Sequence, residues 1–264
     1  MNAPEKKIDS QALVLERRVG GVVHLTLNRP EQFNSLSEEM LAALLATLQK
    51  IAADTTARVV VLGGAGKAFC AGHDLKQMKA NPKVDYYQKV FADCTRMMMQ
   101  VQKMPQPVIA RVHGIATAAG CQLVAMCDLA VASTEARFAV SGINVGLFCS
   151  TPGVALSRNV DRKRAFEMLV TGEFIDAATA KHRGLINRVA EPDALDAEIA
   201  KLTDAIVAKP AFALALGKDL FYRQGEMGIE AAYQLAGQTM ACNMIDDVAQ
   251  EGVQAFIEKR KPNW

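Results

Sequence analysis

Two short stretches of small residues offer the first chemistry in this chain, through their backbone N–H groups. Residues 71–76 follow a buried-strand pattern and a glycine-rich turn, and residues 114–122 run from another strand pattern into an apolar helix. Small side chains let the carbonyl of a ligand approach the backbone, and a helix N-terminus favours developing negative charge. Two such N–H groups, one from each stretch, would form an oxyanion hole of the kind that a thioester enolate needs.

Each stretch also has an ordinary structural interpretation. Asp74, with Gln77 three residues later, fits the N-cap of a helix, and small residues before a helix commonly serve close packing. The glycine-rich turn is not a P-loop, because Val61 and Ala68 stand where that motif needs Gly and Ser or Thr. No GxSxG elbow of a serine hydrolase occurs in the sequence.

His73 lies within the first of these stretches, and Cys149 lies further along the chain. His73 is a candidate base whose side chain could instead point away, and Cys149 is a candidate nucleophile. An inert, partly buried thiol is the ordinary interpretation of Cys149, because reactivity requires a lowered pKa. Four scattered histidines and six cysteines without a CxxC pair give little support for a metal site or a disulfide framework.

Composition excludes several classes of protein. The 264 residues carry a net charge of +2, without the basic blocks and interleaved aromatics of a nucleic-acid-binding protein. No run approaches the 18 or so apolar residues of a membrane span. Residues 1–10 are polar and have no apolar segment typical of a secretion signal. We therefore expect a cytoplasmic protein that binds neither nucleic acid nor membrane.

Hydrophobic periodicity predicts an α/β core with strands stacked in a spiral or parallel arrangement. Residues 13–15 and 22–27 read as a hairpin, and residues 35–53 read as a helix that begins with a capping box of Ser35 and Glu38. Further elements alternate along the chain. Strands are expected at 58–62, 107–112 and 129–132, and helices at 121–126, 162–169, 177–182 and 195–208. The rest of the chain reads as helical with apolar faces that pack on the core or form subunit contacts.

Four stretches of the sequence resemble the crotonase (enoyl-CoA hydratase/isomerase) family. They are AFCAGHDLKQM at 68–78, VHGIATAAGCQLVAMCDLAVAS at 112–133, VTGEFIDAATAKHRGLINRV at 170–189 and EGVQAFIEKRKPNW at 251–264. They occur in the family's order and cover nearly the whole chain. The runs TAAGCQL and GLFCSTPGVAL resemble one subgroup of that family in particular.

The resemblance implies a crotonase-type spiral of ββα units with a C-terminal helical oligomerisation part. It places an acyl-CoA-binding core at 1–200 and a helical trimerisation region at 201–264. The implied partners are an acyl-CoA substrate and further copies of the chain, as a homotrimer or hexamer. Coenzyme A enters as part of the substrate, so no separate cofactor and no metal are expected.

The resemblance also assigns residues to the site. The N–H groups of His73 and Ala119 would form the oxyanion hole. The residues that would bind substrate are Ala71, His73, Asp74, Leu75, Lys76, Ala119 and Gly120. Phe256 and Lys259 are weaker candidates for the coenzyme A pocket of a neighbouring subunit, and a solvated helix end explains Lys259 more simply.

The chain departs from the family at the two catalytic positions. Gln122 and Gly142 stand where a hydratase of the family places its two glutamates, and residues 141–150 contain no carboxylate. An amide does not act as a general base near neutral pH, and Gly142 has no side chain. The stretch 148–153 is longer than the usual loop of the family and could deliver a different group to the pocket.

Three functions are therefore compatible with the sequence. One is a lyase of the enoyl-CoA hydratase type in fatty acid or acyl-CoA metabolism. The second is another acyl-CoA thioester reaction, such as hydrolysis or decarboxylation, in which His73 or Cys149 takes part. The third is a non-catalytic acyl-CoA-binding protein.

Overall fold

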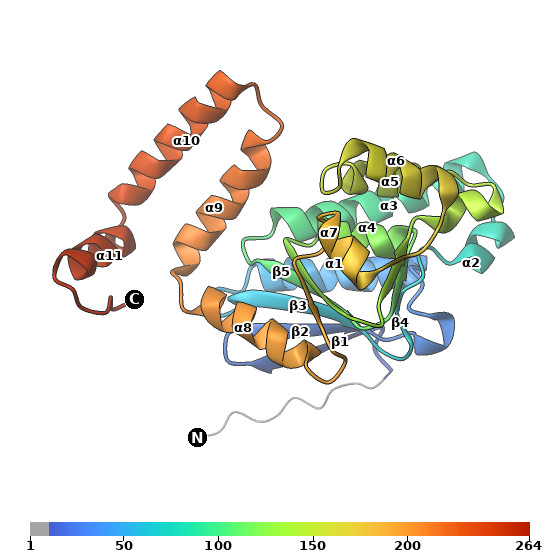
Figure 1. The fold of residues 1–264 in the computed structure, drawn as a ribbon, viewed down its shortest axis with the longest axis horizontal. Coiled ribbons are helices and arrows are strands. Elements are labelled where there is room, and N and C mark those ends of the chain that lie inside the picture. The colour runs from blue at the N-terminus through green and yellow to red at the C-terminus, as the bar shows by residue number, and fades with distance from the viewer. Residues whose placement is uncertain (1–10) are drawn as a thin grey trace.

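Two β-sheets form the centre of the molecule, for which a computed structural model describes residues 11–264 (Figure 1). The expectations for residues 1–10 lie outside the described part. The larger sheet has six strands in the order β1 (Val14–Val19), β2 (Val22–Leu27), β3 (Val59–Gly64), β5 (Val108–Val112), β7 (Leu129–Ser133) and β10 (Arg188–Ala190). The pair β1–β2 is antiparallel, and every other neighbouring pair in this sheet is parallel.

The smaller sheet runs β4, β6, β8, β9. These strands are β4 (Ala68–Cys70), β6 (Ile115–Thr117), β8 (Arg137–Ala139) and β9 (Ile175–Asp176). Successive strands therefore alternate between the sheets, since β3, β5 and β7 lie in the larger one and β4, β6 and β8 in the smaller one. Helices follow each such pair of strands. The expected spiral of ββα units is confirmed, and the predicted hairpin is β1–β2.

Helices surround the sheets and continue beyond them. Those of the core are α1 (Glu38–Ala52), α2 (Leu75–Ala80), α3 (Val84–Lys103), α4 (Ala119–Met126), α5 (Ser150–Leu156), α6 (Arg162–Thr171), α7 (Ala177–His182) and α8 (Leu195–Val207). Two short 3₁₀ helices occupy Pro30–Gln32 and Ser141–Val145. Helix α3 was not predicted from the sequence. The prediction that Ser35 caps α1 is wrong. Ser37 is the N-cap, and its hydroxyl accepts a hydrogen bond from the N–H of Met40.

The core follows from the hydrophobic patterns. Leu44, Leu48 and Ile51 recur at helical spacing in α1 and are fully buried. Residues 59–62 of β3 are buried on both faces of the sheet, which explains their unbroken apolar run. Leu195 and Ile199 of α8 belong to a cluster on the larger sheet, so the expected boundary near residue 200 falls inside a helix that packs on the core.

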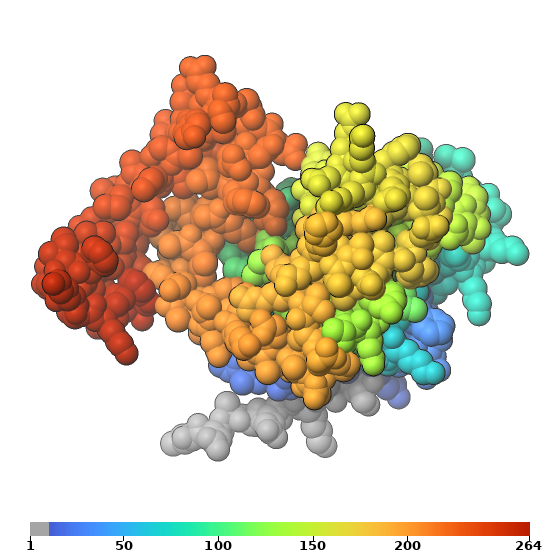
Figure 2. All heavy atoms as spheres, viewed as in Figure 1, coloured from blue at the N-terminus to red at the C-terminus, as the bar shows by residue number. Residues whose placement is uncertain are grey.

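A C-terminal arm, residues 211–264, projects away from the core (Figures 1 and 2). Its helices are α9 (Ala211–Gln224), α10 (Ile229–Met244) and α11 (Asp247–Ile257). The buried residues of these helices are Lys218, Ala232 and Ala255 alone. No helix of the described residues is long and apolar enough to cross a membrane.

Candidate functional site

A cavity of about 360 Å³ lies at the carboxyl ends of three neighbouring strands of the smaller sheet. Strands β4, β6 and β8 are parallel, so their carboxyl ends meet at one edge. They lead into residues 71–74, 118–119 and 140–149. The crevice outside the carboxyl ends of parallel strands is the usual place for a ligand in open α/β sheets.

The two stretches singled out in the sequence touch each other at this edge. A Cβ atom on Gly72 would lie 3.3 Å from the backbone N of Ala119. A Cβ atom on Gly120 would collide with the carbonyl of Cys70, at the end of β4. Gly120 is therefore required so that α4 can begin directly against β4, and this close approach brings the backbones of His73 and Ala119 to the same cavity.

The N–H groups of His73 and Ala119 have no acceptor within the described part of the chain. Ala119 is the first residue of α4, where an N–H has no partner inside the helix. Ala118, just before it, has φ 50° and ψ −121°, a conformation that is unfavourable for a residue with a Cβ atom. Strained backbone of this kind tends to cluster at ligand sites.

The cavity includes some of the residues expected from the sequence and not others. Its lining contains Ala71, His73, Leu75, Ala119 and Gly142. The remaining expected residues are outside that lining: Asp74, Lys76, Gly120 and Gln122.

Asp74 has the structural role that its spacing predicted. It is the N-cap of α2 and accepts hydrogen bonds from the N–H groups of Lys76 (3.1 Å) and Gln77 (3.2 Å). Its second carboxylate oxygen pairs with Arg29 at 3.1 Å. Partial burial acts to raise the pKa of Asp74, but the hydrogen bonds from Gln77 and Arg29 outweigh it and hold the pKa below its ordinary value.

Gln122 is buried, with 6% of its surface exposed, and its Oε1 atom has no hydrogen-bond partner among the described residues. It lies three residues after Ala119 in α4, so both are on one face of that helix. Position 122 therefore holds a neutral amide one turn beyond the cavity wall.

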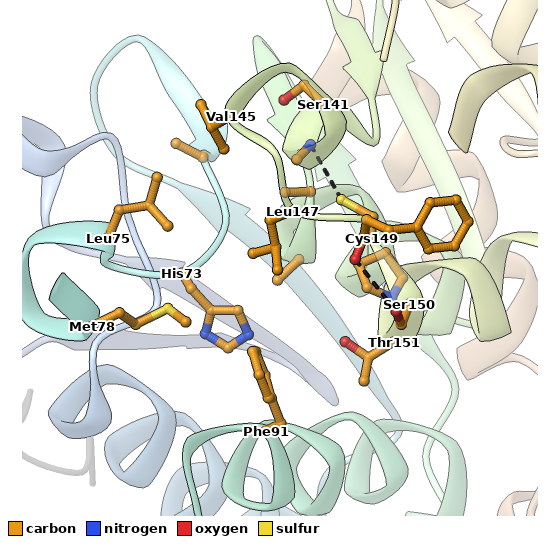
Figure 3. Close-up of a pocket in the computed structure, with 16 residues that line it drawn as sticks. His73, Leu75, Met78, Phe91, Ser141, Val145, Leu147, Cys149, Ser150 and Thr151 are labelled. Carbon is orange, nitrogen blue, oxygen red and sulfur yellow. Dashed lines mark hydrogen bonds between the residues drawn. The ribbon is translucent and has the colours of Figure 1, made fainter. Parts of the chain in front are cut away.

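At Gly142 the space for a side chain is already occupied. A Cβ atom there would lie 2.5 Å from the carbonyl oxygen of Leu147 and 2.7 Å from Sγ of Cys149. The N–H of Gly142 donates a hydrogen bond to Sγ of Cys149 over 3.3 Å (Figure 3). Beside it, the hydroxyl groups of Ser141 and Thr117 are 2.7 Å apart. The loop before α5 thus fills the place from which a glutamate would extend.

The stretch expected to deliver new groups does reach the cavity. Residues 147–152 all line it, and no carboxylate is present in the lining. Burial raises the pKa of the Cys149 thiol, and the hydrogen bond from Gly142 opposes this rise only in part. Cys149 is therefore a protonated thiol near neutral pH, not an activated nucleophile.

The half-buried side chain of His73 lines the cavity (Figure 3). The ring packs edge-on against Phe91, with 5.5 Å between the ring centroids. Both ring nitrogens are buried and lack a hydrogen-bond partner among the described residues. Burial lowers the pKa of His73, and the nearby backbone of Leu36 opposes this in part without reaching hydrogen-bond geometry.

Phe91 and Met78 belong to the cavity wall, although neither was predicted from the sequence as a site residue. They come from α3 and α2. Their apolar periodicity marks a buried helix face, but it does not tell which faces line a cavity and which fill the core. No signal in the sequence alone would have placed Phe91 beside His73.

This fold is that of the enoyl-CoA hydratase/isomerase family, the crotonases, and the chain belongs to that family. The family model "Enoyl-CoA hydratase/isomerase" matches residues 17–264. Among solved structures, an enoyl-CoA hydratase from Mycobacterium smegmatis superimposes with a TM-score of 0.94 at 66% sequence identity, covering 96% of this chain and 98% of that one.

Similarity to one subgroup is also clear. Human enoyl-CoA hydratase domain-containing protein 3 superimposes with a TM-score of 0.93 at 42% identity, covering 96% of this chain and 100% of that one. The mitochondrial protein of that name from Xenopus laevis is 46% identical over 92% of this chain and 83% of its own length. This is the subgroup that the runs TAAGCQL and GLFCSTPGVAL resemble, so that prediction is confirmed.

Proposed function

We propose that the cavity binds an acyl-CoA thioester, whose carbonyl oxygen accepts hydrogen bonds from the N–H groups of His73 and Ala119. The observation that carries the proposal is the pair of N–H donors left without a protein acceptor at the edge of a cavity that contains no carboxylate. Donors arranged in this way polarise a carbonyl and stabilise an enolate. Without glutamates at positions 122 and 142, the protein hydrates enoyl-CoA poorly.

The typical sizes of two catalytic contributions support treating acyl-CoA binding and enoyl-CoA hydration as separate properties. General acid–base catalysis contributes a factor of roughly 10²–10⁴ to the rate. One oxyanion donor contributes a further factor of about 10²–10³. Replacement of both glutamates removes the first contribution and leaves the second in place.

Around the thioester, Ala71 and Leu75 line the cavity, and Ala119 and Gly120 supply the start of α4. Lys76 is exposed beyond the cavity. We assign Lys76 to the phosphate groups of coenzyme A, where a lysine forms charge-assisted hydrogen bonds. Asp74 acts indirectly, because it caps α2 and holds the 71–76 stretch in place.

The second candidate is a different thioester reaction on the same scaffold, such as hydrolysis or decarboxylation. The observation in its favour is His73, a titratable base inside the cavity lining. A purely acyl-CoA-binding protein is the third candidate, and it needs no proton transfer.

The arm supports a proposal of self-association into a trimer or hexamer. Its helices leave large apolar side chains in solvent, among them Ile245 (79% exposed), Ile229 (75%), Tyr233 (74%) and Phe256 (84%). Exposed apolar area of this extent marks an interaction surface. Phe256 lies in α11 and Lys259 just after it, and no residue of the arm lines the cavity of its own subunit, so a role in coenzyme A binding requires a neighbouring copy. Light scattering on the purified protein gives the number of copies.

We propose that the protein acts in acyl-CoA metabolism, including that of fatty acids. The relatives from Xenopus laevis and Homo sapiens carry the word mitochondrial in their names, which is said of those proteins. For this chain the cytoplasm remains a prediction, and fractionation of the host cell tests it.

The test is a calorimetric titration of the intact protein with butyryl-CoA and with free coenzyme A. In parallel, butyryl-CoA labelled with ¹³C at the carbonyl is followed by NMR, because polarisation moves the carbonyl resonance downfield. Crotonyl-CoA hydration is measured by absorbance, and release of free coenzyme A from butyryl-CoA is measured by chromatography.

Binding of butyryl-CoA with a downfield shift, and with hydration far below that of a hydratase with both glutamates, is the expected result. An unshifted carbonyl resonance in the bound ligand would rule out the oxyanion hole. Rapid hydration of crotonyl-CoA would contradict the prediction that a cavity without carboxylates hydrates enoyl-CoA poorly. Release of coenzyme A would favour the second candidate over the third.

A further inference from the structure

The last residue of the chain returns to the place where the C-terminal arm leaves the core. The indole N–H of Trp264 donates a hydrogen bond to the carbonyl of Ala208 over 3.2 Å. Ala208 is the C-cap of α8, which packs on the larger sheet, and α9 begins just beyond it at Ala211. Figure 1 shows the C-terminus beside the start of α9. This contact therefore connects the end of the arm to its base.

Packing alone holds α11 weakly in this position. Among the described residues of α11, Ala255 alone is buried. A groove of about 410 Å³ is lined by Pro210 and Ala213 at the base of the arm and by Val253 of α11. A helix with few buried contacts opens locally at low cost in free energy. Trp264 also lines this groove, so its side chain is the one that connects α11 with the end of α8.

The turn after α11 directs the chain back toward the base of the arm. Lys259 has φ 55°, in the left-handed region that a residue with a Cβ atom seldom adopts. The guanidinium of Arg260 donates to both carboxylate oxygens of Glu251, over 2.6 and 2.8 Å. The N–H of Asn263 donates to the same carboxylate over 2.7 Å. Unfavourable backbone persists where surrounding contacts fix the chain, and these contacts fix the residue before Trp264.

A glycine in α11 leaves the space that the indole occupies. A Cβ atom on Gly252 would lie 2.9 Å from Cζ3 of Trp264. Glycine inside a helix is unfavourable, because it loses the most backbone freedom on folding. By contrast, a Cβ atom on Gly237, in α10, would meet open space. Gly252 is therefore the position in α11 where the ring of Trp264 excludes a side chain.

The orientation of α11 decides where Phe256 points. Phe256 lies four residues after Gly252, on the same face of the helix, and is 84% exposed. We propose that Trp264 is a latch that holds the arm closed, and that α11 in this form presents Phe256 to a further copy of the chain. The second half of this inference rests on the proposed self-association.

Trp264 is the only tryptophan in the sequence, so its fluorescence reports the latch directly. In the intact protein, Gly252→Ala should displace the indole and shift its emission to longer wavelength, because the ring gains contact with water. Gly237→Ala is the matched control, since it adds the same methyl group in open space and should leave the emission unchanged. No shift in Gly252→Ala, or an equal shift in both variants, would overturn the latch.

Hydrogen exchange measures what the latch does to α11. Trp264→Ala should make the α11 amides exchange roughly 5- to 30-fold faster, the change that loss of one hydrogen bond and its apolar cover produces. Trp264→Phe keeps an aromatic ring without the N–H donor and should give a smaller increase. The amides of α1, in the core, should keep their rates. The proteins are compared at a concentration where light scattering gives them the same mass, so that exchange reports opening and not dissociation.

The mass at lower protein concentrations tests the second half of the inference. Trp264→Ala should shift the light-scattering mass toward a single chain, whereas Gly237→Ala should keep the mass of the unaltered protein. Unchanged exchange of α11 in Trp264→Ala would overturn the latch. Faster exchange with an unchanged mass would overturn its role in assembly. A single-chain mass for the unaltered protein would overturn the proposed self-association, and the exchange of α11 would still decide whether Trp264 holds the arm closed.

Discussion

The thiol of Cys149 accepts a hydrogen bond from the backbone N–H of Gly142, with 3.3 Å between sulfur and nitrogen. The sulfur and the carbonyl of Leu147 occupy the space where any side chain at position 142 would begin. A side chain therefore cannot be added at position 142 unless the loop before α5 moves.

Gly142→Ala is expected to destabilise the protein by about 1–3 kcal/mol, because overpacking forces neighbouring atoms to shift. Gly142→Glu should cost at least as much. The double variant Gln122→Glu/Gly142→Glu should not reach the hydration rate of a hydratase. Chemical denaturation measures the stabilities, and the crotonyl-CoA assay measures the rate.

Gln122→Glu alone is the matched control for the hydration assay, since glutamine and glutamate have nearly the same shape. An unchanged stability of Gly142→Ala would contradict the steric argument. Rapid hydration by the double variant would show that the loop moves easily.

Stability should decrease as the pH falls below about 6.5, the ordinary pKa of histidine. Burial lowers the pKa values of His24, His73 and His113 in the folded protein. Between the folded and unfolded pKa values, the unfolded chain binds more protons, so the free energy of unfolding rises with pH in that window. Above the window the histidines contribute no pH dependence.

Denaturant titrations at pH 7.5, 6.5 and 5.5, at one protein concentration, measure this dependence. His73→Phe removes one of the three groups and should reduce the slope. A free energy of unfolding that stays constant from pH 7.5 to 5.5, or a slope that steepens in His73→Phe, would contradict the prediction.

The sequence predicted the fold well where the spacing of apolar side chains alone determines whether a segment is a strand or a helix. The unbroken apolar run of β3 and the helical spacing of α1 are local patterns, and both elements formed as expected. The start of α1 was less determined, because Ser35 and Ser37 both precede the helix and either can cap it. The choice depends on where the preceding turn directs the chain, and that turn is held by long-range contacts such as the N–H of Leu36 to the carbonyl of Gly72.

The site was predictable only through its backbone segments. Small residues before α4 and the cap at Asp74 are visible in the sequence, but the N–H groups of His73 and Ala119 were assigned only through the resemblance to the crotonase family. The contacts that give the cavity its character join distant parts of the chain. Phe91 meets His73 across 18 positions, and the sulfur of Cys149 fills the space at Gly142. Such contacts follow from packing and have no periodic signature.

Cys149 should react slowly with iodoacetamide in the folded protein, although it lines the cavity. Burial raises its pKa, so the reactive thiolate is a minor species at neutral pH. Alkylation is expected to be at least roughly tenfold slower than in the urea-unfolded chain. Saturating butyryl-CoA should slow it further, because the ligand would cover the thiol.

Peptide mapping by mass spectrometry distinguishes Cys149 from the five other free cysteines. Cys149→Ser provides the control for the assignment. Modification of Cys149 in the folded protein as fast as in the unfolded chain would contradict the burial argument and would revive its candidacy as a nucleophile.

Asp128→Asn should weaken the attachment of the arm to the core. The ammonium group of Lys218, on α9, is buried and lies 2.6 Å from Asp128. It also donates to the carbonyls of Val101 and Gln106, each over 2.9 Å. Burial lowers the pKa of Lys218, and the carboxylate of Asp128 is the group that opposes this shift.

Removing one partner of a buried ion pair costs about 3–5 kcal/mol, because the other charge is left uncompensated. Asp128→Asn should lose stability in that range. Since α9 connects the core to the rest of the arm, it should also shift the light-scattering mass toward a single chain. In the double variant Asp128→Asn/Lys218→Met the loss should be smaller than the sum of the two single losses, since no buried charge remains.

Asp219→Asn is the matched control one residue further along α9. Its ion pair with Arg223 is exposed, and such pairs contribute about 0–1 kcal/mol. If Asp128→Asn cost no more than this control, the buried pair would not be what secures the arm. If the mass fell without a loss of stability, the pair would act on assembly and not on the fold of the core.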